Sequence, residues 1–528
     1  MDFSGFLLMR DEISLVALIL ILLLYDLFAP AKARKAFQPV ACLLFVVQIA
    51  ITLLPTAADH AFGGMYVNTP VASVVKTLMS AGTLLVFLFS KKWLEEKHEI
   101  AQGEFYFLTL STLLGMYFMV SSGHFLMFYL GIELASIPLA CLVAFSKKDI
   151  FSAEAGAKFI LNASFASGVS LFGMSLLYGG TGTLYFSDMP IALTGTPLQI
   201  AGMILFATGL FFKMSLIPYH SWTADVYQGA PTQVSAYLSV VSKTAAAVTL
   251  FTIFFKVFGV MAESWKPVLY IIIILSITIA NVFAIRQKNI KRFLAYSSIS
   301  QAGYIVLGVM AASPQGLTGV VYYMMVYMFA NIAAFGVAAL VERQCGNTEI
   351  SSYNGLYKTN PWLSVLMMFA LFSLAGIPPF AGFFSKFFIF ASAVQQGYYI
   401  LVLIALLNTI ISLYYYLLIV RAMFITPNDN PLPNFRSDNY SRIAMVVCFF
   451  GIVLSGIVSF FYNKFDEMAK ESMEICELAM PKATDGTANG IATAAFDGQT
   501  AEAVSGDASA ATATTAMNAT APWPSTQE

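Results

Sequence analysis

Four charged residues lie inside long apolar stretches, where their chemistry is most informative. Glu133 stands in the segment GIELASIP, and Lys213, Lys243 and Lys386 stand in three other apolar segments. Burial in a medium of low dielectric constant penalises the charged form of a lysine, whereas a nearby carboxylate favours it. A buried lysine beside a carboxylate can therefore release and regain a proton. The chemistry that fits is stepwise proton transfer, and the alternative is a set of structural ion pairs.

Segment 205–243 places two of these lysines around interruptions of the apolar pattern. Lys213 lies five residues before Pro218, and the step GAP at 229–231 precedes the stretch that holds Lys243. Broken helices and buried charges are costly in lipid. Membrane proteins tolerate them mostly where ions, protons or solutes move. This segment is therefore the predicted centre of the site.

Two more residues are secondary candidates for proton transfer. His220 follows the break at Pro218 and either relays protons or caps the interrupted helix. Lys158 lies four residues after Glu154, a spacing that predicts an ion pair on one face of a helix. Because a lysine near the membrane surface can extend its ammonium group into water, Lys158 fits either a relay or a surface role.

The composition is that of a polytopic membrane protein. Of the 528 residues, 58% are hydrophobic and 11% are charged, whereas soluble domains carry about 25% charge. The net charge of −1 gives no electrostatic reason to expect a nucleic-acid partner. The five cysteines form no C-x-x-C motif, and the four histidines avoid the middle of the apolar stretches. We therefore expect no metal, haem or other cofactor in this chain. The many Phe, Tyr and Met residues are interpreted as core and lipid-facing bulk.

Apolar runs predict an all-α polytopic membrane protein of about fourteen transmembrane helices, since one span needs about 20 apolar residues. The predicted spans are 11–29, 38–55, 70–90, 104–121, 124–145, 154–178, 200–218, 232–258, 267–285, 294–312, 318–341, 362–391, 397–420 and 441–462. The run 362–391 is too long for one straight span and contains GIPP at 376–379, so it should be broken.

The two expected breaks lie in the seventh and twelfth predicted helices, each beside a buried lysine. Corresponding breaks in two halves indicate inverted repeats around a polar site at mid-membrane. The predicted domains are the first three helices in 1–103, a five-helix repeat (helices 4–8) in 104–258, a second repeat (helices 9–13) in 259–420, the last helix in 421–462, and a tail in 463–528. The composition of the tail predicts disorder, apart from a short amphipathic helix at 465–480.

Basic loop residues predict the orientation in the membrane. The loops between successive helices alternate between two sides of the membrane. Those on the less basic side hold only Lys266, with Lys256 at a helix end. Those on the basic side hold Lys32, Arg34, Lys35, Lys91, Lys92, Lys97, Lys147, Lys148, Arg286, Lys288, Lys291, Arg292, Arg343, Lys358, Arg421, Arg436 and Arg442. The pattern predicts both termini on the outer, periplasmic side. Asp11 and Glu12 precede the first apolar run, opposite to the polarity of a signal peptide, so we expect a retained helix.

Several motifs resemble those of the antiporter-like membrane subunits of respiratory complex I, and of the subunit N family in particular. They are FFKMSLIPYHSWTADVYQGAPTQVSAYLSVVSK (211–243), EAGAKFILNASFASG (154–168), KRFLAYSSISQAGYIVLG (291–308) and LAGIPPFAGFFSKFFIF (374–390). The resemblance covers about residues 1–462. It implies a proton-translocating subunit of a bacterial inner-membrane NADH–quinone oxidoreductase, whose NADH, FMN, iron–sulfur clusters and quinone belong to partner subunits.

The resemblance also implies roles for the buried charges. Glu133 and Lys213 correspond to the family's input pair, Lys243 to its central relay and Lys386 to its output side, while Lys158 matches the lysine of the EAxxK motif.

One position departs from the family pattern. Many relatives have a histidine in the tenth helix where this chain has Gln301, which carries no proton at physiological pH. The link between the central and output lysines would then depend on water, Ser297, Ser298 and Tyr304.

Two other functions share parts of the pattern. A subunit of a multi-subunit cation/proton antiporter would share the fold and the lysines, although DVYQGAP and the lysine of the twelfth helix favour the oxidoreductase. An independent transporter of a small solute would need a substrate pocket at the helix breaks and would work as a lone chain. Neighbouring genes for NADH- and quinone-handling subunits would distinguish the first two.

Overall fold

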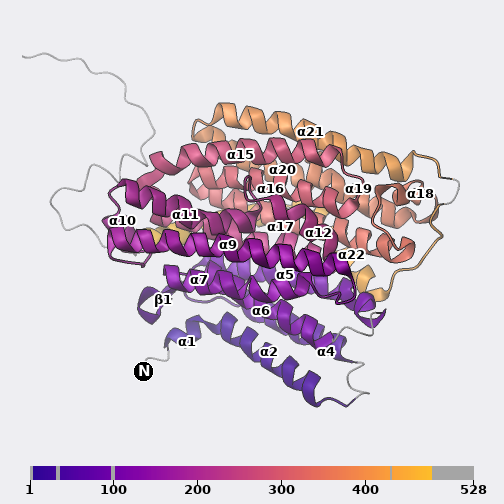
Figure 1. The fold of residues 1–528 in the computed structure, drawn as a ribbon, viewed down its shortest axis with the longest axis horizontal. Helices are drawn as coiled ribbons and strands as arrows, with labels where there is room; N and C mark the ends of the chain where they lie inside the picture. Colours follow the sequence, from indigo (N-terminus) through magenta and orange to yellow (C-terminus); the bar gives the residue numbers. More distant parts are fainter. Residues whose placement is uncertain (1–3, 31–35, 97–101, 429–430, 479–528) are drawn as a thin grey trace, which may run out of the picture. The chain divides into compact units, whose positions relative to one another are not determined.

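Long helices that run side by side make up nearly all of the structure (Figure 1). The computed structural model describes residues 4–30, 36–96, 102–428 and 431–478. Within these ranges, eleven helices are long and apolar enough to cross a membrane, and three shorter apolar helices accompany them. The prediction of an all-α polytopic membrane protein is confirmed, while several predicted bounds need correction.

The N-terminal part holds three long helices and one small hairpin. Its helices are α1 (Ser4–Leu8), α2 (Arg10–Phe28), α4 (Phe37–Leu53) and α5 (Pro70–Glu96). The strands β1 (Asp59–Ala61) and β2 (Tyr66–Asn68) pair antiparallel around the 3₁₀ turn η1 (Phe62–Gly64). The hairpin is missing from the predicted elements, because strands of three residues are shorter than the alternating patterns that signal a strand.

The middle of the chain carries the first broken helix. The elements of this part of the chain are α6 (Gln102–Val120), α7 (Phe125–Leu134), α8 (Ile137–Val143), α9 (Ile150–Thr181), α10 (Met189–Ala192), α11 (Pro197–Met214), α12 (Ser221–Gly229), α13 (Thr232–Tyr237), η2 (Leu238–Ser242), α14 (Lys243–Thr252) and η3 (Ile253–Val257). Both η2 and η3 are π-helical turns, a distortion that is frequent at functional sites.

The remaining elements carry the second broken helix. They are η4 (Gly259–Met261), α15 (Ala262–Ile285), α16 (Ile290–Ala311), α17 (Pro314–Cys345), η5 (Ile350–Tyr353), α18 (Leu356–Thr359), α19 (Pro361–Ala375), α20 (Ala381–Gln395), α21 (Tyr399–Phe424), α22 (Asn439–Ile457) and α23 (Phe460–Leu478). The expected break in 362–391 is confirmed, since the helix stops at Ala375 and resumes at Ala381. Gly376 ends α19 in the left-handed conformation, with φ of 86°.

Two predicted helices differ from the structure near the expected site. The helix predicted at 200–218 ends earlier, at Met214, because Ser215 adopts a left-handed conformation with φ of 61°. Pro218 therefore lies inside the break, after Ser215 has already ended the helix, and does not start it. The helix predicted at 124–145 is divided into α7 and α8, and the division follows Glu133 by two residues.

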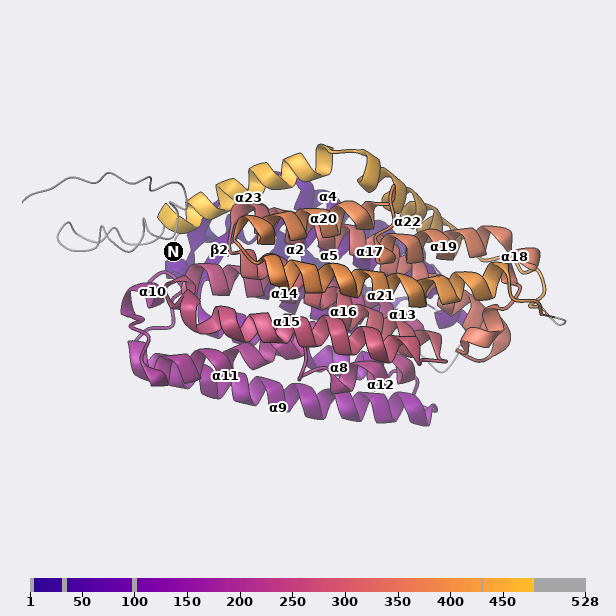
Figure 2. The same ribbon diagram turned by 90° about the horizontal axis from the view of Figure 1, so that it is seen from above.

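The helix α17 lies between many others and contacts α16, α19, α20, α22 and α23. Figure 2 shows α23 running along the edge of the bundle near α20. The side chain of Ser472 in α23 accepts a hydrogen bond of 3.0 Å from the backbone nitrogen of Val71, at the start of α5. The predicted amphipathic helix 465–480 falls in α23, which begins earlier. Residues 479–528, Lys32, Arg34, Lys35 and Lys97 lie outside the described residues.

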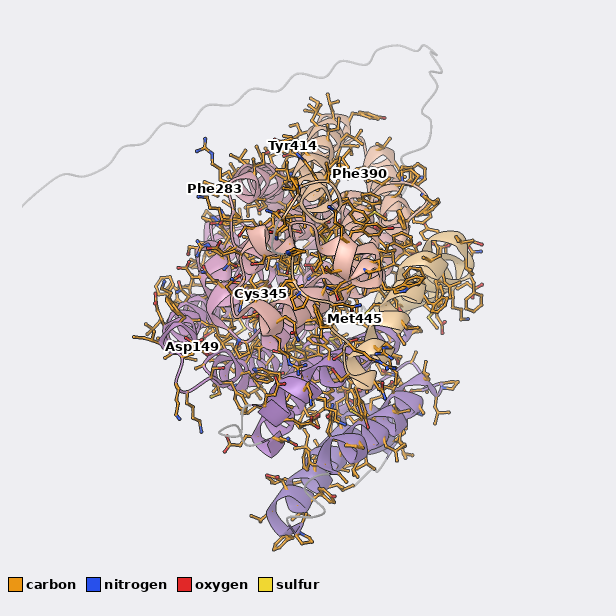
Figure 3. The ribbon with its side chains drawn as sticks, turned by 90° about the vertical axis from the view of Figure 1, so that its right-hand side faces the viewer. Asp149, Phe283, Cys345, Phe390, Tyr414 and Met445 are labelled. Carbon is orange, nitrogen blue, oxygen red and sulfur yellow. The ribbon has the colours of Figure 1, made fainter. Side chains whose placement is uncertain are left out.

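Side chains fill the space between the helices, as the view along the bundle shows (Figure 3). Phe283 and Tyr414 lie at its outer edge, with exposed fractions of 46% and 56%. Met445 lies between helices and is buried. Large apolar side chains on the outer edge suit contact with lipid.

Glycines allow α9 and α11 to approach closely. A Cβ atom on Gly173 of α9 would lie 2.2 Å from the backbone nitrogen of Phe206 and 2.6 Å from the carbonyl oxygen of Gly202, both on α11. Small residues permit such backbone contact between membrane helices. Because Lys213 lies in the last turn of α11, this contact helps to position one of the buried lysines.

We expect Gly173→Ala to lower the free energy of unfolding by ~1–3 kcal/mol, because two backbones must separate to admit the methyl group. Gly168→Ala, on the same helix, is the matched control, since no atom lies within 4 Å of its added Cβ. Melting temperatures of the assembled, detergent-solubilised protein measure the difference. Equal melting temperatures for the two variants would contradict the close contact.

Candidate functional site

Three of the residues singled out in the sequence are buried lysines. The exposed fractions of Lys213, Lys243 and Lys386 are 5%, 1% and 4%. They belong to three elements, α11, α14 and α20. A buried ammonium group needs hydrogen bonds or a counter-charge, or it loses its proton. The surroundings of each lysine therefore indicate what it can do.

Lys213 lies in the last turn of α11, and Glu133 lies in the last turn of α7. Their charges interact electrostatically. Nevertheless, Nζ of Lys213 and Oε1 of Glu133 are both buried without a hydrogen-bond partner in the described part of the chain. Unpaired buried polar atoms are rare in folded proteins and require an explanation. An amine and a carboxylate held near each other without a fixed bond suit a pair that exchanges protons.

Packing between α6 and α7 holds Glu133 in place. A Cβ atom on Gly131 would lie 2.8 Å from the backbone nitrogen of Met119, and one on Gly115 would lie 2.4 Å from that of Ala135. The backbones of the two helices are therefore in direct contact around the carboxylate.

Lys243 begins α14 directly after the π-helical turn η2. Its Nζ atom donates hydrogen bonds to the carbonyl oxygen and to Oγ of Ser298 on α16, at 3.1 and 2.6 Å. The hydroxyl of Tyr327 donates to the same Oγ at 2.9 Å. Nδ2 of Asn331 donates to Tyr327 at 3.0 Å and to Oγ of Ser239 at 2.7 Å. The central lysine thus lies at one end of a buried network of hydroxyl and amide groups.

Lys386 binds the end of the broken helix. Its Nζ atom donates to the carbonyl oxygens of Leu374 and Ala375, at 3.0 and 2.9 Å. These carbonyls belong to the last turn of α19, where no further turn donates hydrogen bonds to them and the helix dipole is negative. The ammonium group also lies 5.0 Å from the ring centroid of Tyr304. The break therefore supplies the acceptors that a buried cation needs.

Gln301 lies beside the partners of Lys386. Its Nε2 atom donates to the carbonyl oxygen of Leu374 at 3.0 Å and to the hydroxyl of Tyr416 at 3.1 Å. Its Oε1 atom accepts a hydrogen bond from Tyr323. Gln301 and Lys386 thus share one carbonyl acceptor. Gln301 is therefore a fully hydrogen-bonded amide beside Lys386.

Neighbouring serines on α16 join the surroundings of Lys243 and Lys386. Ser298 accepts from Lys243, and Oγ of Ser297 contacts the hydroxyl of Tyr416 at 2.5 Å. Tyr416 in turn accepts from Gln301. The sequence identified both serines, but it missed Tyr323, Tyr327 and Tyr416, which were assigned to bulk packing. No local pattern separates these tyrosines from their apolar neighbours; only helix packing brings them together.

Lys158 and His220 lie apart from this network. Lys158 forms the expected ion pair with Glu154 at 2.7 Å and a second with Asp225 at 2.8 Å, while its side chain is 41% exposed. Burial alone would raise the pKa of Asp225. The hydrogen bonds and charges of Lys158 and Arg292 outweigh burial, so the pKa lies below its ordinary value. His220 stands at the N-cap of α12 without a capping hydrogen bond from its side chain. His220 therefore occupies the capping position of this helix, but its side chain does not cap it.

Lys291 was predicted to lie in a loop, but it lies in the first turn of α16 and is 4% exposed. Its Nζ atom donates to the carbonyl oxygen of Ala230 at 2.9 Å and pairs with Glu342 at 3.6 Å. Ala230 follows the end of α12, so Lys291 satisfies a carbonyl that the helix end leaves free.

A second buried ion pair lies in the N-terminal helices. Nζ of Lys76 is 2.6 Å from Oε1 of Glu12, and both side chains are almost fully buried. The sequence pattern placed Glu12 in the flank of the first helix. The burial of Glu12 depends on its contact with Lys76 of α5, which the residues around Glu12 do not predict.

No group of three or more His, Cys, Asp or Glu side chains comes together as a metal site among the described residues. A cavity of about 900 Å³ lies beside the start of α19 and is lined by residues such as Asn360, Trp362, Arg436 and Arg442. None of its lining residues belongs to either helix break, where the solute-transporter alternative would place its pocket.

Comparisons with known proteins agree with this geometry. Residues 122–412 match the family model described as NADH:quinone oxidoreductase/Mrp antiporter, transmembrane region. NADH-quinone oxidoreductase subunit N of Phocaeicola vulgatus is 58% identical over 471 residues, which cover 89% of this chain and 100% of the relative. The protein of the same name from Azobacteroides pseudotrichonymphae is 52% identical over 468 residues, with 88% and 98% covered.

Solved structures with the same fold include chains of two different complexes. A chain of respiratory complex I from Thermus thermophilus with bound aureothin has a TM-score of 0.72 and 29% identity, and the match covers 85% of this chain and 97% of that one. A chain of the Mrp complex from Dietzia sp. has a TM-score of 0.77, 19% identity and coverages of 91% and 100%; this second likeness concerns the fold alone. By the family model and by its relatives, the chain belongs to the antiporter-like membrane proteins of NADH–quinone oxidoreductase, in the subunit N family.

Proposed function

We propose that this chain is a proton-translocating membrane subunit of an NADH–quinone oxidoreductase. It couples electron transfer from NADH to quinone, which takes place in other subunits, to proton movement across the membrane. The observation that carries the proposal is the set of buried lysines Lys213, Lys243 and Lys386. Hydrogen-bonded side chains lie between Lys243 and Lys386. Relatives that are 58% and 52% identical bear the name of subunit N of this enzyme.

In this proposal, Glu133 and Lys213 form the input pair. When the carboxylate approaches the amine, it stabilises the protonated form, and when it withdraws, burial favours the neutral amine and the proton moves on. Both groups have an unpaired buried atom, so the pair can tighten without first breaking another hydrogen bond. Lys158 and His220 are secondary candidates for proton entry.

Lys243 acts as the central relay and Lys386 as the output side. The hydroxyl of Ser298 can accept a proton from Lys243 while it releases its own, as hydroxyl groups do in hydrogen-bonded chains. Gln301 does not carry the proton. It is a positioning residue that holds the hydroxyl of Tyr416 and the carbonyl shared with Lys386.

We infer fourteen transmembrane spans with two inverted five-helix repeats, helices 4–8 within 104–258 and helices 9–13 within 259–420. The broken helices α11–α12 and α19–α20, each beside a buried lysine, support this arrangement. The distribution of basic residues supports both termini on the periplasmic side of a bacterial inner membrane.

The redox groups belong, in this proposal, to partner subunits of complex I with which the chain assembles. These groups are the NADH site, FMN, the iron–sulfur clusters and the quinone site. The chain is then a translocase component of the enzyme without a redox centre of its own.

A multi-subunit cation/proton antiporter is the second candidate, because the family model covers both kinds of protein and the fold resembles a chain of the Mrp complex. Membranes in which sodium-dependent proton movement, but not NADH–quinone activity, depends on this chain would favour the antiporter.

Replacing the central lysine tests the proposal directly. We expect Lys243→Ala to reduce both NADH-driven quinone reduction and the proton gradient by about a hundredfold, the order expected when a positioned proton-transfer group is removed. Lys288→Ala removes an exposed lysine and is the control. Both activities are measured in membrane vesicles after assembly of the complex has been verified. Normal activities in an assembled Lys243→Ala complex would leave the lysine as a structural group.

Gln301 offers a test of the link between Lys243 and Lys386. We expect Gln301→Leu to slow proton translocation about thirtyfold, because the hydrogen bonds to Tyr416 and to the shared carbonyl, worth ~1 kcal/mol each, are lost. Gln301→His keeps hydrogen-bonding capacity and should retain most of the rate. Initial rates of gradient formation in vesicles measure the difference. If Gln301→Leu and Gln301→His behave alike, Gln301 does not position the link.

A further inference from the structure

The buried pair of Glu12 and Lys76 lies outside the residues assigned above to proton transfer. Its Nζ–Oε1 distance is 2.6 Å, and the two side chains have exposed fractions of 1% and 0%. Tyr66, from the hairpin, lies between them. Lys76 donates to the hydroxyl of Tyr66 at 3.0 Å, and this hydroxyl donates to Oε2 of Glu12 at 2.9 Å. All three groups can release or accept a proton.

Charged groups continue from this cluster toward solvent. Asp11 precedes Glu12 on α2 and interacts electrostatically with Lys76. Arg10 contacts Asp11 at 3.3 Å, and its side chain is 29% exposed. The guanidinium group of Arg10 is held by the carbonyl oxygen of Leu54, at 2.8 Å. Glu12 is thus the chain neighbour of Asp11, which pairs with the partly exposed Arg10. This region lies near the end of the bundle where α1 and β1 are found (Figure 1).

Hydroxyl groups lead from the same cluster toward the interior. Nζ of Lys76 is 5.7 Å from the ring centroid of Tyr117, whose hydroxyl is hydrogen-bonded to Ser80. Further along α6, Oγ1 of Thr112 lies 2.7 Å from the hydroxyl of Tyr237. Tyr237 ends α13, and η2 leads from there directly into α14. The helix α5 packs against both α13 and η2.

A buried ion pair by itself is weak evidence of function, because structural pairs are also buried. Two features distinguish this one. The hydroxyl of Tyr66 bridges the two charges and provides a second route for a proton between them. The pair also has an exposed charged neighbour on one side and a line of hydroxyl groups on the other. A purely structural pair requires neither feature.

We propose that Glu12, Lys76 and Tyr66 form a second proton-exchange site, between the central lysine and the outer end of the bundle. In the exchange, Lys76 gives a proton to the oxygen of Tyr66 while Tyr66 gives its own proton to Glu12. The products are a neutral amine and a carboxylic acid, so the number of protons is conserved. The acid then loses its proton toward Asp11, and the amine takes the next proton from the interior. This inference rests on the function proposed above.

The first test removes both charges at once. The double variant Glu12→Gln/Lys76→Met leaves no unpaired buried charge, so the complex should assemble. We expect NADH-driven proton translocation in vesicles to fall about fivefold, equivalent to ~1 kcal/mol in the barrier. The control is Lys92→Met/Glu95→Gln, which removes an exposed ion pair of 3.7 Å from the same helix and should leave the rate unchanged. Unaltered translocation in the assembled Glu12/Lys76 double variant overturns the proposal.

The second test uses Tyr66→Phe, which removes only the bridging hydroxyl and decides the question even if the double variant fails to assemble. A loss of translocation at unchanged melting temperature supports the exchange site. A normal rate, whether or not the melting temperature falls, overturns it. Lys243→Ala is measured in parallel. If Lys243→Ala is impaired and Tyr66→Phe is not, only the exchange site fails, whereas normal rates in both variants also remove the proposed function.

Discussion

The need to give a buried ammonium group its acceptors explains much of this structure. In a continuous helix, every backbone carbonyl except those of the last turn already accepts one hydrogen bond, so an ordinary membrane helix offers few free acceptors to an inserted lysine. The chain solves the problem by ending helices inside the bundle. Lys386 bonds to two carbonyls at the end of α19, and Lys291 bonds to the carbonyl that follows α12. These two helix ends thus provide the polar surroundings that allow Lys386 and Lys291 to be buried beside them.

The buried lysines differ in how firmly they are held. Lys386 and Lys243 have fixed acceptors, whereas Lys213 has none among the described residues. Hydrogen-bond acceptors favour the protonated form of an amine, and an amine that depends on a nearby carboxylate changes its protonation when that carboxylate moves. This gradation is consistent with the separate input, relay and output roles that we propose for these chemically identical side chains.

The parts of the site that could be predicted from the sequence are those with a local signal. A lysine within an apolar run is visible without any structure, and so is the GIPP step that separates α19 from α20. The tyrosines around Gln301 have no such signal, because their hydroxyls meet only after α16, α17 and α21 pack together. Ser215 was missed for a similar reason. Serine rarely adopts a left-handed conformation, so the sequence pattern favours the nearby Pro218 as the residue that ends the helix.

The hydrogen bond between Val71 and Ser472 has a consequence for how the chain is made. The two residues are separated by 401 positions, and the bond satisfies a backbone amide at the start of α5, one of the first amides that a helix cannot satisfy itself. A membrane protein is synthesised from its N-terminus, so α5 enters the bilayer long before α23 exists. During that interval this amide needs another partner, such as interfacial water. This hydrogen bond can therefore form only after α23 has been synthesised, about 400 residues later than α5.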